Sequence, residues 1–172
     1  MAILETDRLI LRTQEESDLD AIDQMQSSPE VMKYVGEGKI ISREITEKSI
    51  KFWIKYGEEK RYSSWAIVEK STGKLIGKCG LCELKDKSDI ELFYMLAKDS
   101  WGRGYATEIS KAVLKYGQEE LGLNRIVALV YPENKVSQKV IEKMGMHYEK
   151  EKEVNGIKLL MYSAEKKINS ME

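Results

Sequence analysis

The segment from Lys98 to Glu108 constrains the fold of this chain most, because it joins a predicted strand to a predicted helix through two closely spaced glycines. The residues before it, 90–96, form a short apolar and aromatic run, whereas the apolar residues after it recur at helical spacing. Gly102 and Gly104 let backbone N–H groups converge without Cβ atoms in the way, and the first helical turn adds N–H groups without partners. Such an elbow favours an anion, especially a phosphate. The alternative is an ordinary helix start whose glycines only relieve strain.

Length and charge limit the class of protein. A chain of 172 residues is most simply one domain, here taken as residues 1–172, with a tail that we expect to fray from about residue 165. The 28 lysines and arginines balance 29 aspartates and glutamates, so no broad basic surface predicts binding to nucleic acid. No apolar segment approaches membrane-spanning length, and the N-terminus does not read as a targeting segment. We therefore expect a cytoplasmic protein with no nucleic-acid or membrane partner.

The cysteines predict no metal site. Cys79 and Cys82 form a C-x-x-C pair within a predicted strand, where residues three apart point to opposite faces. The single histidine, His147, and the lack of a second cysteine pair give zinc too few ligands. The expectation is two ordinary core thiols.

The first third of the chain predicts a strand followed by helices. Alternating apolar residues over 6–12 predict the first strand. Serine or proline ahead of apolar residues at helical spacing predicts helices that begin at Ser17, Pro29 and Ser42. The third of these carries an aromatic stripe that includes Trp53, and such a stripe is more typical of a core than of a ligand site. Tyr34 and the turn at Gly36–Gly38 lie in loops that could border a pocket beside this stripe.

The rest of the chain predicts a mixed sheet. Strands joined by short polar turns should be antiparallel, and three of them are predicted over 64–69, 75–84 and 90–96. The helix after the elbow leads into a strand over 125–131, so this strand should run parallel to the one before the elbow. A last helix ends at Gly145, and Asn155-Gly156 predicts a final hairpin. The expected fold is α/β, a mixed sheet of about seven strands with about four helices.

Glu91 is the candidate base. On the strand over 90–96, parity places Glu91 on the same face as Phe93 and Met95. Burial among apolar neighbours disfavours the charged carboxylate, so its pKa should rise from about 4.3 towards neutrality, where a glutamate can accept a proton. The alternative is a glutamate on a sheet surface that faces water.

Asn134 and Ser137 follow the predicted strand over 125–131. Ligands of open α/β sheets commonly bind at the carboxyl ends of strands, so both side chains could face the ligand of the elbow. The alternative is that Asn134 is only the N-cap of the last helix and Ser137 a polar residue of its first turn.

Rival motifs fit poorly. A dinucleotide-binding fingerprint would require glycine where the chain has Thr107, and the Gly-Lys-Ser/Thr of a P-loop is absent from the sequence. The G-x-S-x-G of hydrolases is absent as well, and His147 precedes a predicted strand, where it is poorly placed for a catalytic pair.

The order of elements together with the elbow resembles the GNAT superfamily of N-acetyltransferases, over nearly the whole chain from Thr6 to Ala164. The segments that carry the resemblance are TDRLILR at 6–12, WGRGYATE at 101–108, and NKVS at 134–137 followed by EKMG at 142–145. They are most similar to the branch that contains the ribosomal-protein N-terminal acetyltransferases.

The resemblance implies a site for acetyl-coenzyme A (acetyl-CoA) at the elbow. In the superfamily a Q/R-x-x-G-x-G/A elbow holds the pyrophosphate, and here Gly104 and Ala106 fill its last two positions while Trp101 stands at the first. The contacts are mainly backbone N–H groups, to which Arg103 would add side-chain charge. The cofactor-binding residues implied in the elbow are Trp101, Gly102, Arg103, Gly104, Tyr105, Ala106 and Thr107.

The resemblance also implies roles around two splayed strands, 90–96 and 125–131, with the pantetheine arm between them. Asn134 would hydrogen-bond this arm, the backbone at Leu96 would polarise the thioester, and Glu91 would help to remove the amine proton. The tyrosine acid of many members is replaced by Ile141, so Ser137 is the first candidate for the acid. Tyr131 is a second candidate. Phe93 stands where relatives often have a small residue, which bears on the local bulge and on the direction of Glu91.

The predicted function is N-acetyl transfer from acetyl-CoA to a primary amine by direct attack, without a metal. The acceptor implied by the branch is the N-terminal amine of a ribosomal or other protein, with Tyr34 and Trp53 bordering its site. The alternatives are a small-molecule acetyltransferase acting on a polyamine or aminoglycoside, and a non-catalytic module that binds acyl-CoA. Either a monomer or a homodimer is compatible with the sequence.

Overall fold

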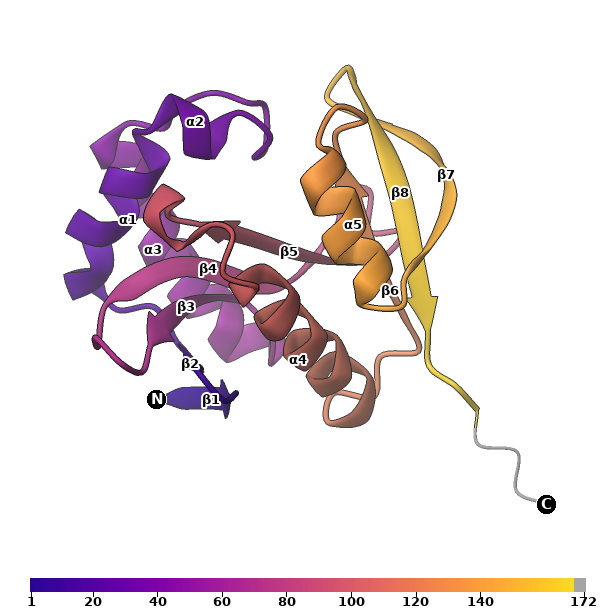
Figure 1. Cartoon of the computed structure of the whole chain (residues 1–172), viewed down its shortest axis with the longest axis horizontal. Coiled ribbons are helices and arrows are strands. Elements are labelled where there is room, and N and C mark those ends of the chain that lie inside the picture. Colours follow the sequence, from indigo (N-terminus) through magenta and orange to yellow (C-terminus); the bar gives the residue numbers. More distant parts are fainter. Residues whose placement is uncertain (169–172) are drawn as a thin grey trace.

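The protein folds around one mixed β-sheet, seen in a computed structural model that describes residues 1–168 (Figure 1). Eight strands in the described chain follow the order β1-β2-β3-β4-β5-β6-β8-β7. The strands are β1 (Ala2–Glu5), β2 (Leu9–Arg12), β3 (Ser64–Glu69), β4 (Leu75–Glu83), β5 (Ile90–Leu96), β6 (Arg125–Val130), β7 (His147–Val154) and β8 (Ile157–Glu165). The helices are α1 (Leu19–Gln26), α2 (Pro29–Met32), α3 (Arg43–Lys60), α4 (Tyr105–Glu119) and α5 (Lys135–Lys143). The predicted α/β fold with a mixed sheet is confirmed.

The N-terminal segment differs from its prediction. The strand predicted over 6–12 is shorter in the structure, where β2 begins only at Leu9, and β1 before it was not predicted. The chain turns between the two strands, with the Thr6 N–H donating to the Leu9 carbonyl at 2.9 Å. The helix predicted from Ser17 begins later, since residues 16–18 form a 3-10 turn. This 3-10 turn is capped by the side chains of Glu15 and Asp18, each of which accepts a hydrogen bond from the backbone N–H of the other residue.

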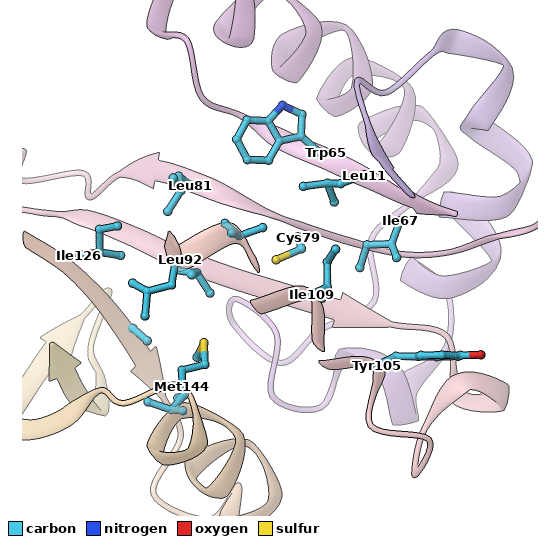
Figure 2. Packing of buried hydrophobic residues seen from close by; sticks show 14 of the residues in the cluster. Leu11, Trp65, Ile67, Cys79, Leu81, Leu92, Tyr105, Ile109, Ile126 and Met144 are labelled. Carbon is cyan, nitrogen blue, oxygen red and sulfur yellow. The ribbon is translucent and has the colours of Figure 1, made fainter. Parts of the chain in front are cut away.

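Helices cover both faces of the sheet. In Figure 1, α4 and α5 lie in front of the sheet and α3 lies behind it. The larger core packs α4 and α5 onto the sheet, and Figure 2 shows Ile109 of α4 beside Cys79 of β4. The smaller core joins α1, α2 and α3 to Met95 on the opposite face. Leu92 and Met95 thus lie in different cores, as strand parity predicts.

The sheet is almost unpaired at its centre, between β5 and β6. β4 and β5 pair without interruption from Glu83↔Ile90 to Gly77↔Leu96, so there is no bulge at Phe93. β5 and β6 are parallel, as predicted, yet within residues 1–168 they share the single rung Glu91↔Val127. Beyond that rung the two strands diverge.

The C-terminal hairpin forms as predicted, with left-handed φ values of +50° at Asn155 and +76° at Gly156. β8 extends to Glu165, and the Lys166 N–H donates to the Asn124 carbonyl at 2.7 Å, so ordered contacts continue just past the residue where fraying was predicted. The remainder of that tail, residues 169–172, lies outside the described residues. None of the helices within residues 1–168 is both long enough and apolar enough to cross a bilayer.

Candidate active site

A cavity of about 1550 Å³ lies along the divergence of β5 and β6. It exceeds the roughly 300–1000 Å³ that one drug-sized ligand occupies, which leaves room for two substrates. Its wall brings together residues far apart in the sequence, from α2 and α3 through the elbow to α5. The predicted site residues that line it are Tyr34, Trp53, Glu91, Leu96, Trp101, Gly102, Gly104, Tyr105, Ala106, Thr107, Asn134 and Ser137. Arg103 is the predicted residue that lies apart from this wall.

The elbow has the geometry of an anion cradle. Gly102 and Gly104 adopt φ values of +71° and +79°, which side-chain-bearing residues rarely adopt. A Cβ atom at Gly102 would meet nothing within 4 Å, so the space above this backbone is open. The hydrogen bond from the Glu108 N–H to the Gly104 carbonyl, 3.0 Å, opens α4, and the N–H groups of residues 105–107 therefore have no acceptor within the helix. These donors and glycines suit a pyrophosphate group.

Side chains fix the elbow to the strands around it. The Trp101 indole N–H donates to the Leu96 carbonyl at 3.0 Å, which ties the elbow to the end of β5. The Arg103 guanidinium reaches Glu69 at 3.4 Å, so its charge is directed toward a carboxylate rather than into the cavity. Glu69 also accepts from the Tyr105 hydroxyl at 2.6 Å.

A second set of contacts joins the N-terminal turn to the first turn of α4. Glu108 accepts from the Thr6 hydroxyl at 2.6 Å and from the Arg8 Nε at 2.7 Å. Arg8 also donates from Nη1 to the Arg103 carbonyl at 2.9 Å and lies over the Tyr105 ring at 4.3 Å from its centroid. This network, which we call the elbow brace, comprises Thr6, Arg8, Arg103 and Glu108. Sequence reasoning used these residues as family motifs and missed that they touch.

Glu91 occupies the rung where β5 and β6 meet, and its half-buried side chain lines the cavity. Its neighbour across β4 is Cys82, which also lines the cavity, whereas Cys79 is buried in the larger core. The prediction of two core thiols is therefore correct for Cys79 alone. Desolvation raises the pKa of Glu91 to about 7, which places the carboxyl in the range of a general base.

Ser137 has a partner that sequence reasoning missed. Its hydroxyl lies 2.7 Å from the Tyr94 hydroxyl, joining α5 to β5 across the cleft. Asn134 is the helix N-cap, because its Oδ1 accepts from the Ser137 N–H at 3.2 Å. The Asn134 Nδ2 makes no hydrogen bond to any residue of the described chain, so capping and ligand binding are compatible. A tyrosine in an apolar strand was a usable signal, since a buried phenol needs a polar partner.

Aromatic side chains form the wall on the α3 side. The Trp53 and Phe93 rings lie 5.9 Å apart, and Phe52 is 56% exposed, so the stripe predicted to be core faces the cavity instead. Tyr131 donates to the Gly36 carbonyl at 2.6 Å, and its ring lies 5.5 Å from that of Tyr34. The loop around Gly36 is thereby held at the carboxyl end of β6.

A family model described as an acetyltransferase (GNAT) domain matches residues 8–147, which include the elbow, Glu91 and Ser137. The chain belongs to the GNAT acetyltransferase family. The resemblance predicted from the sequence is therefore confirmed. This GNAT domain is 37% identical over 148 residues to the uncharacterized N-acetyltransferase YoaA of Bacillus subtilis (strain 168), covering 86% of this chain and 84% of the relative.

Solved GNAT structures share the fold. The GNAT-family acetyltransferase from Bacillus anthracis superposes with a TM-score of 0.82 at 25% identity, over 95% of this chain and 98% of the other. RimL, a ribosomal L7/L12 alpha-N-protein acetyltransferase solved in complex with coenzyme A, gives a TM-score of 0.81 at 17% identity, over 96% and 98%. At that identity the likeness extends to the fold alone.

Within residues 1–168 no group of three or more His, Cys, Asp or Glu side chains is arranged to hold a metal ion.

Proposed function

We propose that this GNAT enzyme transfers the acetyl group of acetyl-CoA to a primary amine by direct attack of the amine nitrogen. The observation that carries the proposal is the position of Glu91, at the rung where β5 and β6 begin to diverge. The elbow follows the other end of β5 and lines the same cavity. A base and an anion cradle thus lie at opposite ends of one cleft.

The cleft suits acetyl-CoA, which supplies the acetyl group as a thioester. The glycines and first-turn N–H groups of the elbow would hold its pyrophosphate. The free Nδ2 of Asn134 would donate to the pantetheine arm. The main chain near Leu96 would lie beside the start of this arm, and the thioester would lie further along β5, toward Glu91. Arg103 contributes mainly through its backbone, because its guanidinium is directed toward Glu69.

Glu91 acts as the general base. Its carboxylate takes a proton from the incoming ammonium, so that the nitrogen lone pair can form the C–N bond as the C–S bond breaks. Because desolvation raises the pKa of Glu91 to about 7, the carboxylate is both available near neutral pH and basic enough to accept the proton.

Tyr94 and Ser137 supply the proton that the departing thiolate needs. Their hydroxyls form one hydrogen-bonded pair on the wall of the cavity, in which Tyr94 donates to Ser137 as Ser137 gives its proton away. This arrangement supports the predicted role of Ser137 and adds Tyr94 to it. A thiol with a pKa of about 8.5 is a fair leaving group, so the pair has a modest share of the rate.

The acceptor is a primary amine that enters beside Trp53 and Tyr34. A protein N-terminus is one candidate, as RimL is named for acting on ribosomal L7/L12. A small molecule is the other, as a microcin C7 self-immunity acetyltransferase of the same fold was solved with acetyl-CoA and AMP. The aromatic wall contacts a ligand of either kind.

The test is release of free thiol from acetyl-CoA with a panel of amines, for the native protein and for Glu91→Gln. The native kcat/KM should rise with pH until about 7 and then level, because only the carboxylate form accepts a proton. The variant should lose roughly 10²–10⁴-fold and lack this rise. Glu44→Gln, on the exposed side of α3, is the matched control. Coenzyme A binding without turnover on any amine would instead favour a non-catalytic acyl-CoA module.

A further inference from the structure

Lys78 is a charged residue of the cavity that the reaction above does not use. It lies on β4 opposite Met95, in the register that also pairs Cys82 with Glu91. Residues that alternate along one strand share a face, so Lys78, Cys82 and Glu91 all face the α1–α3 side of the sheet. All three line the cavity.

The Lys78 ammonium has no counter-ion among the residues that the structure describes. Its Nζ donates to the Gln26 Oε1 at 2.8 Å, and Gln26 in turn donates to Thr46 at 3.3 Å. An ammonium carries three N–H donors, so two are left over after this contact. Within residues 1–168 no carboxylate forms an ion pair with Lys78, and desolvation alone lowers its pKa to about 8.

Two carboxylates on the cavity wall are already paired with other lysines and so do not neutralise Lys78. Glu30 lies 2.6 Å from Lys98, and Glu83 lies 3.0 Å from Lys60. A buried cation without a partner is costly, whereas one that meets an anion forms a strong, charge-assisted contact. Lys78 is therefore prepared to bind an anion that arrives through the cavity.

The distance along the sheet between Lys78 and Glu91 limits which molecules can place an anion at Lys78 and an amine at Glu91. The Lys78 rung, at Met95, lies four residues along β5 from Glu91, which is roughly 13 Å at the rise of a strand. A molecule that reaches both side chains must carry its anion several bonds from its amine. A free α-amino acid is too short.

We propose that Lys78 binds an anionic group of the acceptor, so that the preferred substrate is a primary amine with a carboxylate or phosphate several bonds from the nitrogen. This inference rests on the proposed acetyl transfer. It disfavours polyamines and aminoglycosides, which would bring a second cation toward the ammonium.

The test compares acceptors that differ in one charge. 6-Aminohexanoate and 6-aminohexyl phosphate are matched with neutral 6-aminohexanamide, and spermidine represents a polycation. In the native protein each anionic amine should have a kcat/KM roughly tenfold to a hundredfold above that of the amide. The larger of the two anionic values distinguishes a carboxylate site from a phosphate site.

Variants assign the preference to Lys78. Lys78→Met should raise the KM for the anionic amines to that of the amide while kcat for the amide stays the same, and Lys78→Arg should keep part of the preference. Lys74→Met, an exposed lysine just before β4, is the matched control and should behave like the native protein. A merely structural lysine would change all acceptors equally.

Two results separate this inference from the acetyl transfer itself. Thiol release with equal kcat/KM for the anionic amines and the amide, or a preference that survives in Lys78→Met, overturns the anion site and leaves acetyl transfer standing. If no amine supports turnover, calorimetric titration of 6-aminohexanoate and the amide in the presence of coenzyme A decides. The site is supported if 6-aminohexanoate binds more tightly than the amide and this difference disappears in Lys78→Met. It is refuted if the two ligands bind equally or if neither binds.

Discussion

The hydroxyl pair of Tyr94 and Ser137 shows how one side chain sets the chemistry of another. The 2.7 Å contact joins a strand to a helix across the cleft, so the proposed proton delivery requires both residues in place. Tyr94→Phe and Ser137→Ala should each lower kcat about tenfold. The loss is modest because a thiolate departs readily, whereas a more basic leaving group would depend more strongly on a proton donor. The double variant should lose no more than either single one, since the two hydroxyls act as a unit.

Steady-state thiol release over a pH series measures these losses. Tyr116→Phe removes a hydroxyl from α4, where the ring packs on Trp65, and should leave kcat unchanged. Losses that simply multiply in the double variant would show that the two hydroxyls act separately.

Single residues differ in how far the sequence foretells their roles. The face of Glu91 follows from strand parity alone, because Glu91 alternates with Met95, which packs in the core on the α1–α3 face. The sequence hints that Tyr94 needs a polar partner, but the partners of Lys78 and Tyr94, Gln26 and Ser137, are identified only in three dimensions, because they are 52 and 43 residues away in the chain. No local pattern marks such pairs.

At the scale of elements, the elbow brace holds the loop in shape before any ligand arrives. In a trans peptide the carbonyl and the following N–H point in opposite directions. Because Arg8 fixes the Arg103 carbonyl, it also fixes the direction of the Gly104 N–H. Arg8 further neutralises Glu108, whose negative charge would otherwise oppose a phosphate at the start of α4.

Arg8→Gln should therefore raise the KM for acetyl-CoA about tenfold, since a charge-assisted contact is worth roughly 1.5–3 kcal/mol and only part of it reaches the ligand. S-acetylpantetheine, which lacks the pyrophosphate, should be used equally well by the variant and the native protein. Arg43→Gln removes a comparable arginine, paired with Asp20 and Asp23 on α1, and is the control. An equal loss with both thioesters would contradict the role of the brace.

Elements were predictable where turn chemistry is local. At the elbow glycines and at the Asn155-Gly156 hairpin the residue types themselves predict the backbone conformation, and both segments adopt left-handed φ values as expected. The strand β1 was missed because four residues are too few to show an alternation. The brace was missed because its two halves lie about a hundred residues apart.

At the scale of the molecule, α4 connects the two parts of the sheet that diverge at the cleft. Gly117 lies where the helix crosses them, and a Cβ atom there would meet Ile126 of β6 at 2.7 Å and Leu81 of β4 at 3.1 Å. Both contacts are made by Cδ1 methyl groups at the ends of flexible side chains, so part of the crowding can be relieved by a change of rotamer.

Gly117→Ala should change the free energy of unfolding by no more than about 1 kcal/mol, because the Cδ1 methyl groups can turn aside and the roughly 1 kcal/mol that alanine gains in helix propensity offsets the remaining crowding. Thermal unfolding checks this, with Lys115→Ala on the exposed face of α4 as the control for propensity. A loss above about 3 kcal/mol for Gly117→Ala would contradict this expectation and mean that the two side chains cannot move.

The single rung between β5 and β6 has a consequence for how freely this sequence can change. The outer edges of the sheet are protected, since β1 is short and β7 alternates glutamate and lysine over 149–153. The inner edges beyond Glu91 keep unpaired amides, yet they lie within the cleft. A ligand that hydrogen-bonds to those amides contacts only the backbone, and every residue except proline provides a backbone N–H group. Side chains of β5 and β6 that take no part in the chemistry can therefore change over evolutionary time while the cleft continues to accommodate the same pantetheine arm.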